Sequence, residues 1–382
     1  MTDPSTEPDV KLLGDVHRPG LVRQPDEFPF HVGDEAAMCE RRMRQTKVDN
    51  MCSPHGRLFW QCEYRNFVMR VECASAVGPL LIDRNRSFPQ RLQIMGWDAP
   101  EPADFKREPR VFDELAIVDT CFSGAWGHFA KDLLPRLFVV LKYVPPHVPI
   151  LLPDHDTARK WLTYLVRVGV VNVSRVNFYG GDYAPFARVA WSPGELARSA
   201  RTDGWRSNSG HCGWRHGLPG LLIRELIYGN AQPGRLRRIT VIDRRAGPKN
   251  VARVLTNQVE LNAALQSHFP DFEILFFRGS DATVDESIAF FNRTALLVGA
   301  HGAGLAYMAW LPPSGAVLEI GYTGDDGFVF PDGDFPSYGL GLGLDYSVSY
   351  ARGSHNGPLL ANISDIVALA RGALVRIGFE LI

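Results

Sequence analysis

The stretch LLVGAHGAGLAYMAWL, residues 296–311, joins two apolar segments through a glycine-rich turn. Residues 296–298 have the composition of a buried strand, and residues 305–311 have helical spacing. Three glycines and one histidine stand between the two segments: Gly299, His301, Gly302 and Gly304. A buried strand does not need so many glycines in its exit turn. We therefore expect a ligand to approach this backbone closely.

This stretch belongs to a series in which short apolar runs alternate with helical patterns. Strands are expected at residues 237–245, 272–277, 295–300 and 315–321, and helices at residues 257–269, 284–294 and 305–311. An earlier series predicts strands at 115–122 and 148–153 and helices at 127–144 and 157–170. Such alternation is typical of parallel sheets that helices cover on both faces. The expected fold class is α/β, with two Rossmann-like domains facing a crevice.

Composition and patterning divide the chain into four parts. Residues 1–30 are polar and lack periodicity, so a disordered or loosely packed tail is expected. Residues 31–215 form an N-terminal α/β domain with a β-rich entry region at 57–75, and residues 216–350 form a C-terminal Rossmann-like domain. Residues 351–382 contain a helix that we expect to close the chain and to pack back on the N-terminal domain.

Overall composition excludes several classes of protein. The chain has 382 residues, of which 45% are hydrophobic, so it can bury the cores of two ordinary domains. Its formal net charge is −1 and no basic run occurs, which argues against a nucleic-acid partner. No apolar stretch is long enough for a transmembrane segment. As written, the sequence has no signal or anchor, which predicts a cytoplasmic protein; a Golgi or endoplasmic reticulum protein with an incomplete N-terminus is the alternative.

The glycine-rich turn is suited to binding an anion. A strand, a glycine loop and a helix N-terminus can together present backbone N–H groups and a positive helix end to a diphosphate. Side-chain cations must assist, and Arg244 or Arg245 ends the strand expected at 237–245. Glu319, at the end of the next strand, is placed to accept hydrogen bonds from ribose hydroxyls. In the alternative, the glycines only form a tight turn, His301 caps it, and Glu319 is solvated.

A dinucleotide-binding loop is a competing interpretation of the same segment. An acidic residue about twenty positions after a glycine loop is also part of that fingerprint. The glycines here have a different order from the fingerprint, and the loop follows the third strand of its series. An NAD(P)-dependent oxidoreductase is therefore the less favoured alternative.

Five segments of the chain form a recognisable set: TVIDRR at 240–245, an Asn257-x-x-Glu260 helix start, LLVGAHGAGLAYMAWLPPSGAVLEIGY at 296–322, FSGAWGHFAKDLLPRL at 122–137 and FPSYGLGLGLDYSVSYA at 335–351. Together they resemble glycosyltransferase family 61, which includes plant core xylosyltransferase, xylan arabinofuranosyltransferases and the EGF-domain O-GlcNAc transferase. The resemblance implies two Rossmann-like domains of GT-B type, a nucleotide-sugar donor and inversion at the anomeric carbon. It also implies that neither a cofactor nor a metal ion is obligatory.

The resemblance assigns roles to particular residues. Arg244 or its neighbour Arg245 matches the arginine that meets the donor diphosphate, and Glu319 matches the ribose contact. The pyrophosphate loop corresponds to His301, Gly302, Ala303, Gly304 and Leu305. The C-terminal domain would then bind the nucleotide sugar, and the N-terminal domain would bind the acceptor.

His128 and Asp132 are candidates for the catalytic base. They lie four residues apart, on one face of the expected helix. An inverting transfer needs one base to take the proton of the acceptor hydroxyl, and Asp132 is the preferred candidate. In the structural alternative, His128 caps the helix and Asp132 pairs with Arg136.

A nearby Asp-x-Asp arrangement, Asp154 and Asp156 around His155, resembles the metal-binding motif of other glycosyltransferases. Its position between the strand at 148–153 and the helix at 157–170 favours helix N-capping instead.

The sequence thus predicts an inverting glycosyltransferase. The expected donor is a UDP-sugar of the xylose, arabinose or GlcNAc class, and the expected acceptor is a hydroxyl of a glycan or glycoprotein. A catalytically inactive homologue that binds a nucleotide sugar or a glycan is the main alternative.

Overall fold

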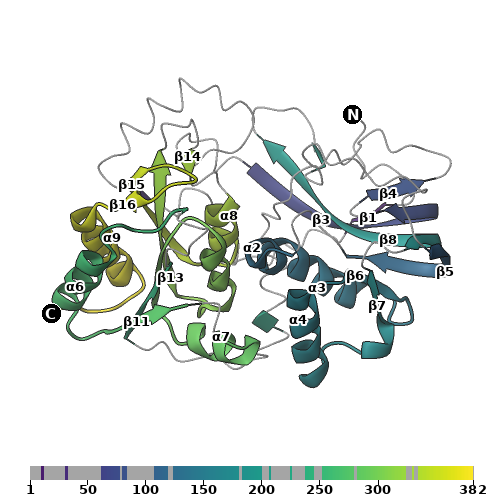
Figure 1. Ribbon diagram of the computed structural model, residues 1–382, viewed down its shortest axis with the longest axis horizontal. Coiled ribbons are helices and arrows are strands. Elements are labelled where there is room, and N and C mark those ends of the chain that lie inside the picture. The colour runs from purple at the N-terminus through teal and green to yellow at the C-terminus, as the bar shows by residue number, and fades with distance from the viewer. Residues whose placement is uncertain are drawn as a thin grey trace. The chain divides into compact units, whose positions relative to one another are not determined.

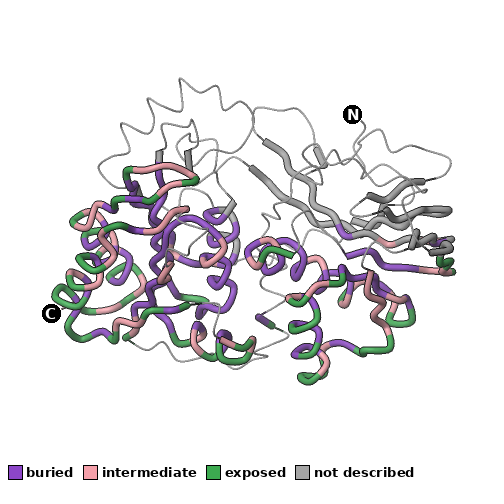
Figure 2. Tube along the Cα trace, viewed as in Figure 1, coloured by how far each residue is buried: buried purple, intermediate pink, exposed green. Residues whose placement is uncertain are grey.

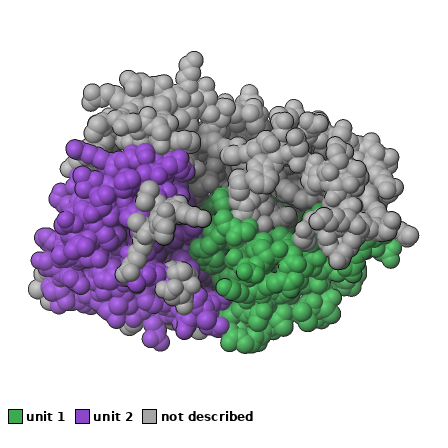
Figure 3. Space-filling view, viewed as in Figure 1, with its two compact units in different colours: residues 1–16, 63–227 green, residues 17–62, 228–382 purple. Residues whose placement is uncertain are grey.

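The computed structural model describes residues 10–12, 31–32, 62–77, 80–83, 107–118, 124–179, 183–199, 206–207, 224–225, 237–244, 252–278, 282–323, 329–330 and 334–381. The chain forms two compact units, which Figure 3 colours separately. Unit 1 comprises Met1–Val16 and Glu63–Ile227, and unit 2 comprises His17–Cys62 and Tyr228–Ile382. Each unit is built on its own sheet, so the protein is a mixed α/β protein.

The sheet of unit 1 combines a parallel part with an antiparallel extension (Figure 1). The parallel strands lie in the order β8 (Tyr183–Ser199), β5 (Arg107–Ile117), β6 (Ile150–Pro153) and β7 (Val176–Tyr179). The order continues beyond β8 with β3 (Cys62–Val77) and β1 (Val10–Leu12), while β4 (Leu80–Asp83) and β9 (Arg206–Ser207) pair with β3 and β8. The strand predicted at 148–153 is present as β6. The strand predicted at 115–122 overlaps β5 only at residues 115–117, and residues 119–122 lie outside the described residues. Three residues of the predicted tail differ from expectation, because they form β1 against β3.

The helix predicted at 127–144 is present, but it is not uniform. It consists of α2 (Trp126–His128), a π-helical turn η5 (Phe129–Leu133) and α3 (Leu134–Tyr143). Pro135 has no N–H to donate, and its ring would clash with the carbonyl of residue 131 in a regular α-helix. The wider π-turn immediately before Pro135 relieves this conflict, and such turns are frequent at functional sites. This part also contains α4 (Asp156–Arg167) and the 3-10 turn η6 (Val173–Arg175).

Unit 2 contains a doubly wound parallel sheet. Its order is β11 (Glu273–Phe277), β10 (Arg238–Ile242), β12 (Leu296–Ala300), β13 (Ala316–Thr323), β15 (Asp345–Gly353) and β16 (Leu359–Leu360). The first five of these strands are parallel, and β16 is antiparallel. Two short strands extend it, β14 (Val329–Phe330) on β13 and β2 (His31–Val32) on β15. The strands predicted at 237–245, 272–277, 295–300 and 315–321 are confirmed as β10, β11, β12 and β13.

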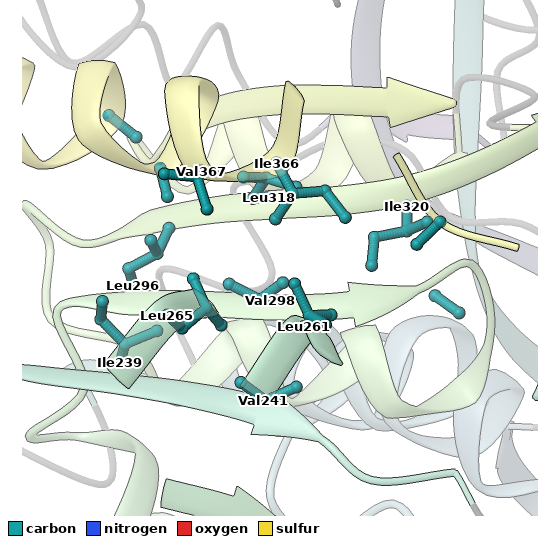
Figure 4. Packing of buried hydrophobic residues seen from close by; sticks show 14 of the residues in the cluster. Ile239, Val241, Leu261, Leu265, Leu296, Val298, Leu318, Ile320, Ile366 and Val367 are labelled. Atoms are coloured by element: carbon teal, nitrogen blue, oxygen red, sulfur yellow. The ribbon is translucent and has the colours of Figure 1, made fainter. Parts of the chain in front are cut away.

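Helices cover both faces of this sheet (Figure 1). One face carries α6 (Gln258–His268) and α9 (Ile363–Arg376); the other carries α7 (Val284–Phe291), the 3-10 helix η7 (Ala303–Trp310) and α8 (Asp334–Gly341). Apolar residues of β10, β12 and β13 interlock with α6 and α9 in the core of unit 2, seen in Figure 4. Figure 2 colours these strands by burial: β12 is buried throughout, and β10 is buried except at its two end residues. Burial on both faces explains why these strands are apolar runs rather than alternating patterns.

Three features of unit 2 differ from the sequence-based expectations. Strand β15 was not predicted, and it completes the parallel sheet beside β13. The C-terminal helix α9, which was expected to pack back on the N-terminal domain, packs on the sheet of its own unit and on α6, since its apolar face enters the core of unit 2. Strand β2 pairs with β15, although residues from 31 onward were assigned to the N-terminal domain. Among the described residues, no helix has the length and apolarity that crossing a membrane requires.

Candidate functional site

The sheet of unit 2 has a topological switch point between β10 and β12. Counted along the chain, its five parallel strands lie in the order 2-1-3-4-5, so the connections leave β10 and β12 toward opposite faces. Ligands of doubly wound sheets bind outside the carboxyl ends of the strands at such a point. Arg244 follows β10 and His301 follows β12. The fold therefore brings two of the predicted site residues together at the place where a ligand is expected.

The three glycines of the turn are needed for different physical reasons. A Cβ on Gly299 would lie 3.0 Å from Ile242 Cγ1, and a Cβ on Gly304 would lie 2.7 Å from Ile242 Cγ2. These two glycines let η7 and β12 pack closely around the Ile242 side chain. Gly302 has φ 140°, a conformation that side-chain-bearing residues rarely adopt. Only Gly302 is required by the conformation of the loop itself.

Two guanidinium groups lie against Gly302. A Cβ built on this glycine would be 2.9 Å from Arg244 Nη1 and 3.3 Å from Arg253 Nη1. Arg244 Nη1 also donates to the carbonyl oxygen of His301, at 3.3 Å. Burial, and secondly the positive charge of Arg253, lower the pKa of Arg244 to about 10. Arg244 therefore remains a cation at neutral pH, in surroundings that favour the arrival of an anion.

Arg253 has an unusual backbone and was not singled out by the sequence. Its φ is +60°, the only positive value among the described residues other than glycine. Its N–H donates to Gly357 O at 2.6 Å, which ties it to the loop after β15. Its Nε is buried and has no hydrogen-bond partner within the part of the chain that the structure describes. It lies in an irregular segment before α6, where neither periodicity nor a motif marked it.

The start of η7 presents backbone donors at the same place. The first hydrogen bond of this helix runs from Leu305 N to Gly302 O, at 2.9 Å. The N–H groups of Ala303 and Gly304 precede that bond, so the helix itself supplies no acceptor for them. The predicted helix at 305–311 is therefore present in 3-10 form, and its N-terminus lies beside the two arginines.

Glu319 is buried rather than available to a ribose. It has no exposed surface, and its Oε1 is 2.5 Å from His301 Nδ1 while its Oε2 accepts from the Tyr346 hydroxyl at 2.6 Å. Both carboxylate oxygens are therefore occupied inside the unit. The expected ribose contact is not supported by this arrangement, and neither is the solvated alternative. Glu319 instead fixes the imidazole of His301, which is itself 6% exposed.

Aromatic side chains enclose His301. Its ring meets Phe335 edge-on at 5.4 Å between centroids, and Tyr322 at 6.2 Å. The Tyr322 hydroxyl lies 2.6 Å from His355 Nδ1. A low-polarity wall of this kind strengthens electrostatic interactions made by the neighbouring arginines.

The predicted catalytic pair lies in unit 1, with His128 at the end of α2 and Asp132 in the π-turn η5. His128 Nδ1 is 2.8 Å from Asp132 Oδ2, and Lys131 Nζ is 3.0 Å from Asp132 Oδ1. The side chains of Asp132 and Lys131 are 0% and 4% exposed, whereas that of His128 is 38% exposed. The prediction that His128 and Asp132 share one face is confirmed. In addition to His128, which the structural alternative did not pair with Asp132, Lys131 contacts its carboxylate.

Aromatic rings pack beneath this pair. Trp126 stacks on Trp161 at 5.9 Å between centroids, and Phe129 meets His155 edge-on at 5.8 Å. His155 is the N-cap of α4, because its Nδ1 accepts from Ala158 N at 3.2 Å. These contacts hold the π-turn against α4.

The Asp-x-Asp segment has a structural role. Asp154 accepts from Arg159 Nε and Nη2 at 2.6 and 2.8 Å. These bonds lower the pKa of Asp154 below its usual value. Capping of α4 was predicted correctly, although His155 rather than an aspartate provides the acceptor. Within the described ranges, no group of three or more His, Cys, Asp or Glu side chains is arranged to hold a metal ion. Arg245, the other candidate for the diphosphate, lies outside the described residues.

Comparison with known proteins decides the family. A family model described as Glycosyltransferase 61 matches residues 126–318, half of the chain. The chain belongs to glycosyltransferase family 61. The resemblance inferred from the sequence motifs is thereby confirmed, and family 61 implies glycosyltransferase activity. The matched region begins at the first residue of α2 and contains His128, Arg244, Arg253 and His301, whereas Glu319 follows its last residue. A search of curated proteins finds no match to the chain.

Proposed function

We propose that this family 61 protein transfers a sugar, with inversion, from a nucleoside-diphosphate sugar to a hydroxyl of a glycan or glycoprotein. The observation that carries the proposal is the group of anion-binding elements at the switch point of unit 2, where two arginines and a helix N-terminus meet at Gly302. A donor of the UDP-xylose, UDP-arabinose or UDP-GlcNAc class follows from the resemblance of the motifs. The two units would be the halves of a GT-B fold, with unit 2 binding the donor and unit 1 the acceptor.

Arg244 and the turn would bind the leaving diphosphate. When the bond between the anomeric carbon and the diphosphate oxygen breaks, the electron pair of that bond stays on the oxygen. Arg244 and the N–H groups of Ala303 and Gly304 can stabilise the added negative charge. Because Arg244 is largely buried, its interaction with an anion is less screened by water than a surface contact. These donors are fixed before the reaction, so little reorganisation is needed.

His128 would act as the base. The acceptor oxygen forms a bond to the anomeric carbon, and its proton passes to the imidazole. Nδ1 of His128 is hydrogen-bonded to Asp132, so the nitrogen atom that takes the proton is Nε2 of His128. Asp132 then stabilises the imidazolium, and its complete burial assigns it to positioning rather than to contact with the acceptor. This reverses the preference for Asp132 drawn from the sequence. In this scheme no step requires a metal ion.

Turnover of His128 variants tests the proposal. Purified protein is incubated with a panel of UDP-sugars and glycan acceptors, in the presence and absence of EDTA. His128→Ala is expected to lower kcat about 100- to 10,000-fold, the usual contribution of a general base, while the Kd for UDP stays within a factor of two or so. EDTA is expected to leave wild-type turnover unchanged.

His147→Ala is the matched control. This histidine belongs to the same unit and also faces a carboxylate, with 3.8 Å between its Nε2 and Glu114 Oε1, but its side chain is 71% exposed. It is expected to keep full activity. A wild-type protein that binds UDP but transfers no sugar would identify a binding homologue, and equal kcat for His128→Ala and wild type would remove His128 from the mechanism.

A further inference from the structure

We propose that Arg253 is the second cation of the donor site, and that the site therefore selects a leaving group with two phosphates over one with a single phosphate. The inference rests on the proposed function, since it concerns the same donor. It adds a residue that the sequence motifs do not contain, and it gives that residue a measurable role in choosing the class of nucleotide.

The two guanidinium groups lie at the same place in the loop. Nη1 of Arg244 and Nη1 of Arg253 both lie within 3.3 Å of the point that a Cβ on Gly302 would occupy. Both groups therefore converge on one backbone position at the carboxyl edge of β12. A single phosphate can be bound by one guanidinium and the helix N-terminus, whereas a diphosphate offers a second anionic group for a second guanidinium.

The positive charges of the two arginines are close enough to affect each other. Neither Arg244 nor Arg253 has an ion-pair partner among the described residues, and the buried carboxylate in this region, Glu319, is bonded to His301 and Tyr346. The charge of Arg253 lowers the pKa of Arg244, which means that the two cations repel each other. Two neighbouring positive charges with no carboxylate between them are costly in a partly buried place. An anion bound between them removes that cost.

The backbone of Arg253 has a left-handed conformation, with φ +60°. An arginine in the left-handed region is strained by roughly 1–2 kcal/mol, and glycine or asparagine would adopt it more readily. Hydrogen bonds on both sides hold the conformation, from Arg253 N to Gly357 O and from Leu359 N to Val254 O, at 2.6 and 2.8 Å. A turn with a purely structural role would be better served by glycine. The arginine side chain, directed at Gly302, supplies the reason for the strain.

The test compares UDP with UMP in calorimetric titrations of the full chain. Arg253→Asn removes the charge and suits the left-handed backbone, so the variant is expected to unfold at or above the wild-type temperature. Its Kd for UDP is expected to rise about tenfold to a hundredfold, as for loss of a charge-assisted hydrogen bond, while its Kd for UMP changes less than about threefold. Arg253→Gly repeats the test in a second residue that suits this backbone.

Arg371→Asn is the matched control, because Arg371 is an exposed arginine of unit 2 that packs over Phe269. It is expected to leave both dissociation constants unchanged. Equal UDP affinity in Arg253→Asn and wild type, together with weakened binding in Arg244→Ala, would overturn the role of Arg253 and leave the proposed function intact. If wild type binds neither UDP, GDP nor ADP, both proposals fail.

Discussion

Replacing Glu319 by alanine is expected to destabilise unit 2 strongly. The carboxylate has no exposed surface and is bonded to His301 Nδ1 and to the Tyr346 hydroxyl. Alanine removes both bonds and leaves the two partners in a buried space without the acceptor that they had. The perturbation is therefore one of folding, in contrast to the loss of an exposed ribose contact.

The magnitude follows from the two bonds. A hydrogen bond to a charged group contributes about 1.5–3 kcal/mol, so Glu319→Ala should lower the free energy of unfolding by about 3–6 kcal/mol. This is a large part of the roughly 5–15 kcal/mol that stabilises a typical domain. Glu319→Gln keeps the shape, since its amide oxygen can accept from His301 and its amide nitrogen can donate to Tyr346. It should cost about half as much, because neutral hydrogen bonds are about half as strong.

Urea unfolding and amide hydrogen exchange measure these effects. The His301 amide donates to Ile320 O at 2.9 Å and reports directly on the junction of β12 and β13. Glu273→Gln is the control, because Glu273 is 51% exposed and its surface ion pair with Arg238 should contribute less than about 1 kcal/mol. If the free energy of unfolding of Glu319→Ala were within about 0.5 kcal/mol of the wild-type value, the hydrogen bonds of Glu319 would not be what stabilises the turn.

Two further predictions concern packing and pH. Gly304→Ala should lower the free energy of unfolding by about 1–3 kcal/mol, because its Cβ would lie 2.7 Å from Ile242 Cγ2, and urea unfolding should give a smaller loss in the Ile242→Ala background. His155→Ala should lower the free energy of unfolding by about 0.5–2 kcal/mol, because the side-chain acceptor for Ala158 N is lost. His155→Asn should retain most of this stabilisation, because asparagine is also a good helix cap. Burial lowers the pKa of His155 below 6.5, so its contribution is present above pH 6.5 and is lost as the pH falls through the folded-state pKa. The thermal unfolding temperature of wild type should therefore fall as the pH is lowered from 7.5 to 5, and that of His155→Asn should fall less. An equal fall in both proteins would exclude His155 as the cause.

Sequence patterns located most of the helices and the strands β6, β10, β11, β12 and β13, but several strands were missed, among them β7 and β8 of unit 1 and β15 of unit 2. β15 carries Ser347 and Ser349, both fully buried, at positions where a predicted core strand would be apolar. Ser349 Oγ donates to Asp365 Oδ2 at 2.5 Å, and Arg376 Nη2 donates to Ser347 Oγ at 3.0 Å. Both partners belong to α9. Since a helix further along the chain satisfies these hydroxyls, the segment did not have the pattern of a buried strand.

The sequence also predicted only part of the candidate site, because some of its residues are positioned by contacts with distant segments. The glycine loop and Arg244 follow predicted strands directly, so their position at the carboxyl edge of the sheet could be inferred from local pattern alone. Arg253 belongs to no periodic segment, and its direction depends on a hydrogen bond to Gly357. The choice between His128 and Asp132 depended on burial, which spacing does not reveal.

The sequence by itself determined the α/β class, the glycine turn after β12 and the family, because hydrophobic period and glycine placement are properties of adjacent residues. Only the tertiary structure decided the environment of Glu319, whose partner Tyr346 is 27 residues away along the chain. It also decided that two arginines converge on Gly302. Burial and charge environment arise from contacts between distant segments, and no local pattern encodes which segments will meet.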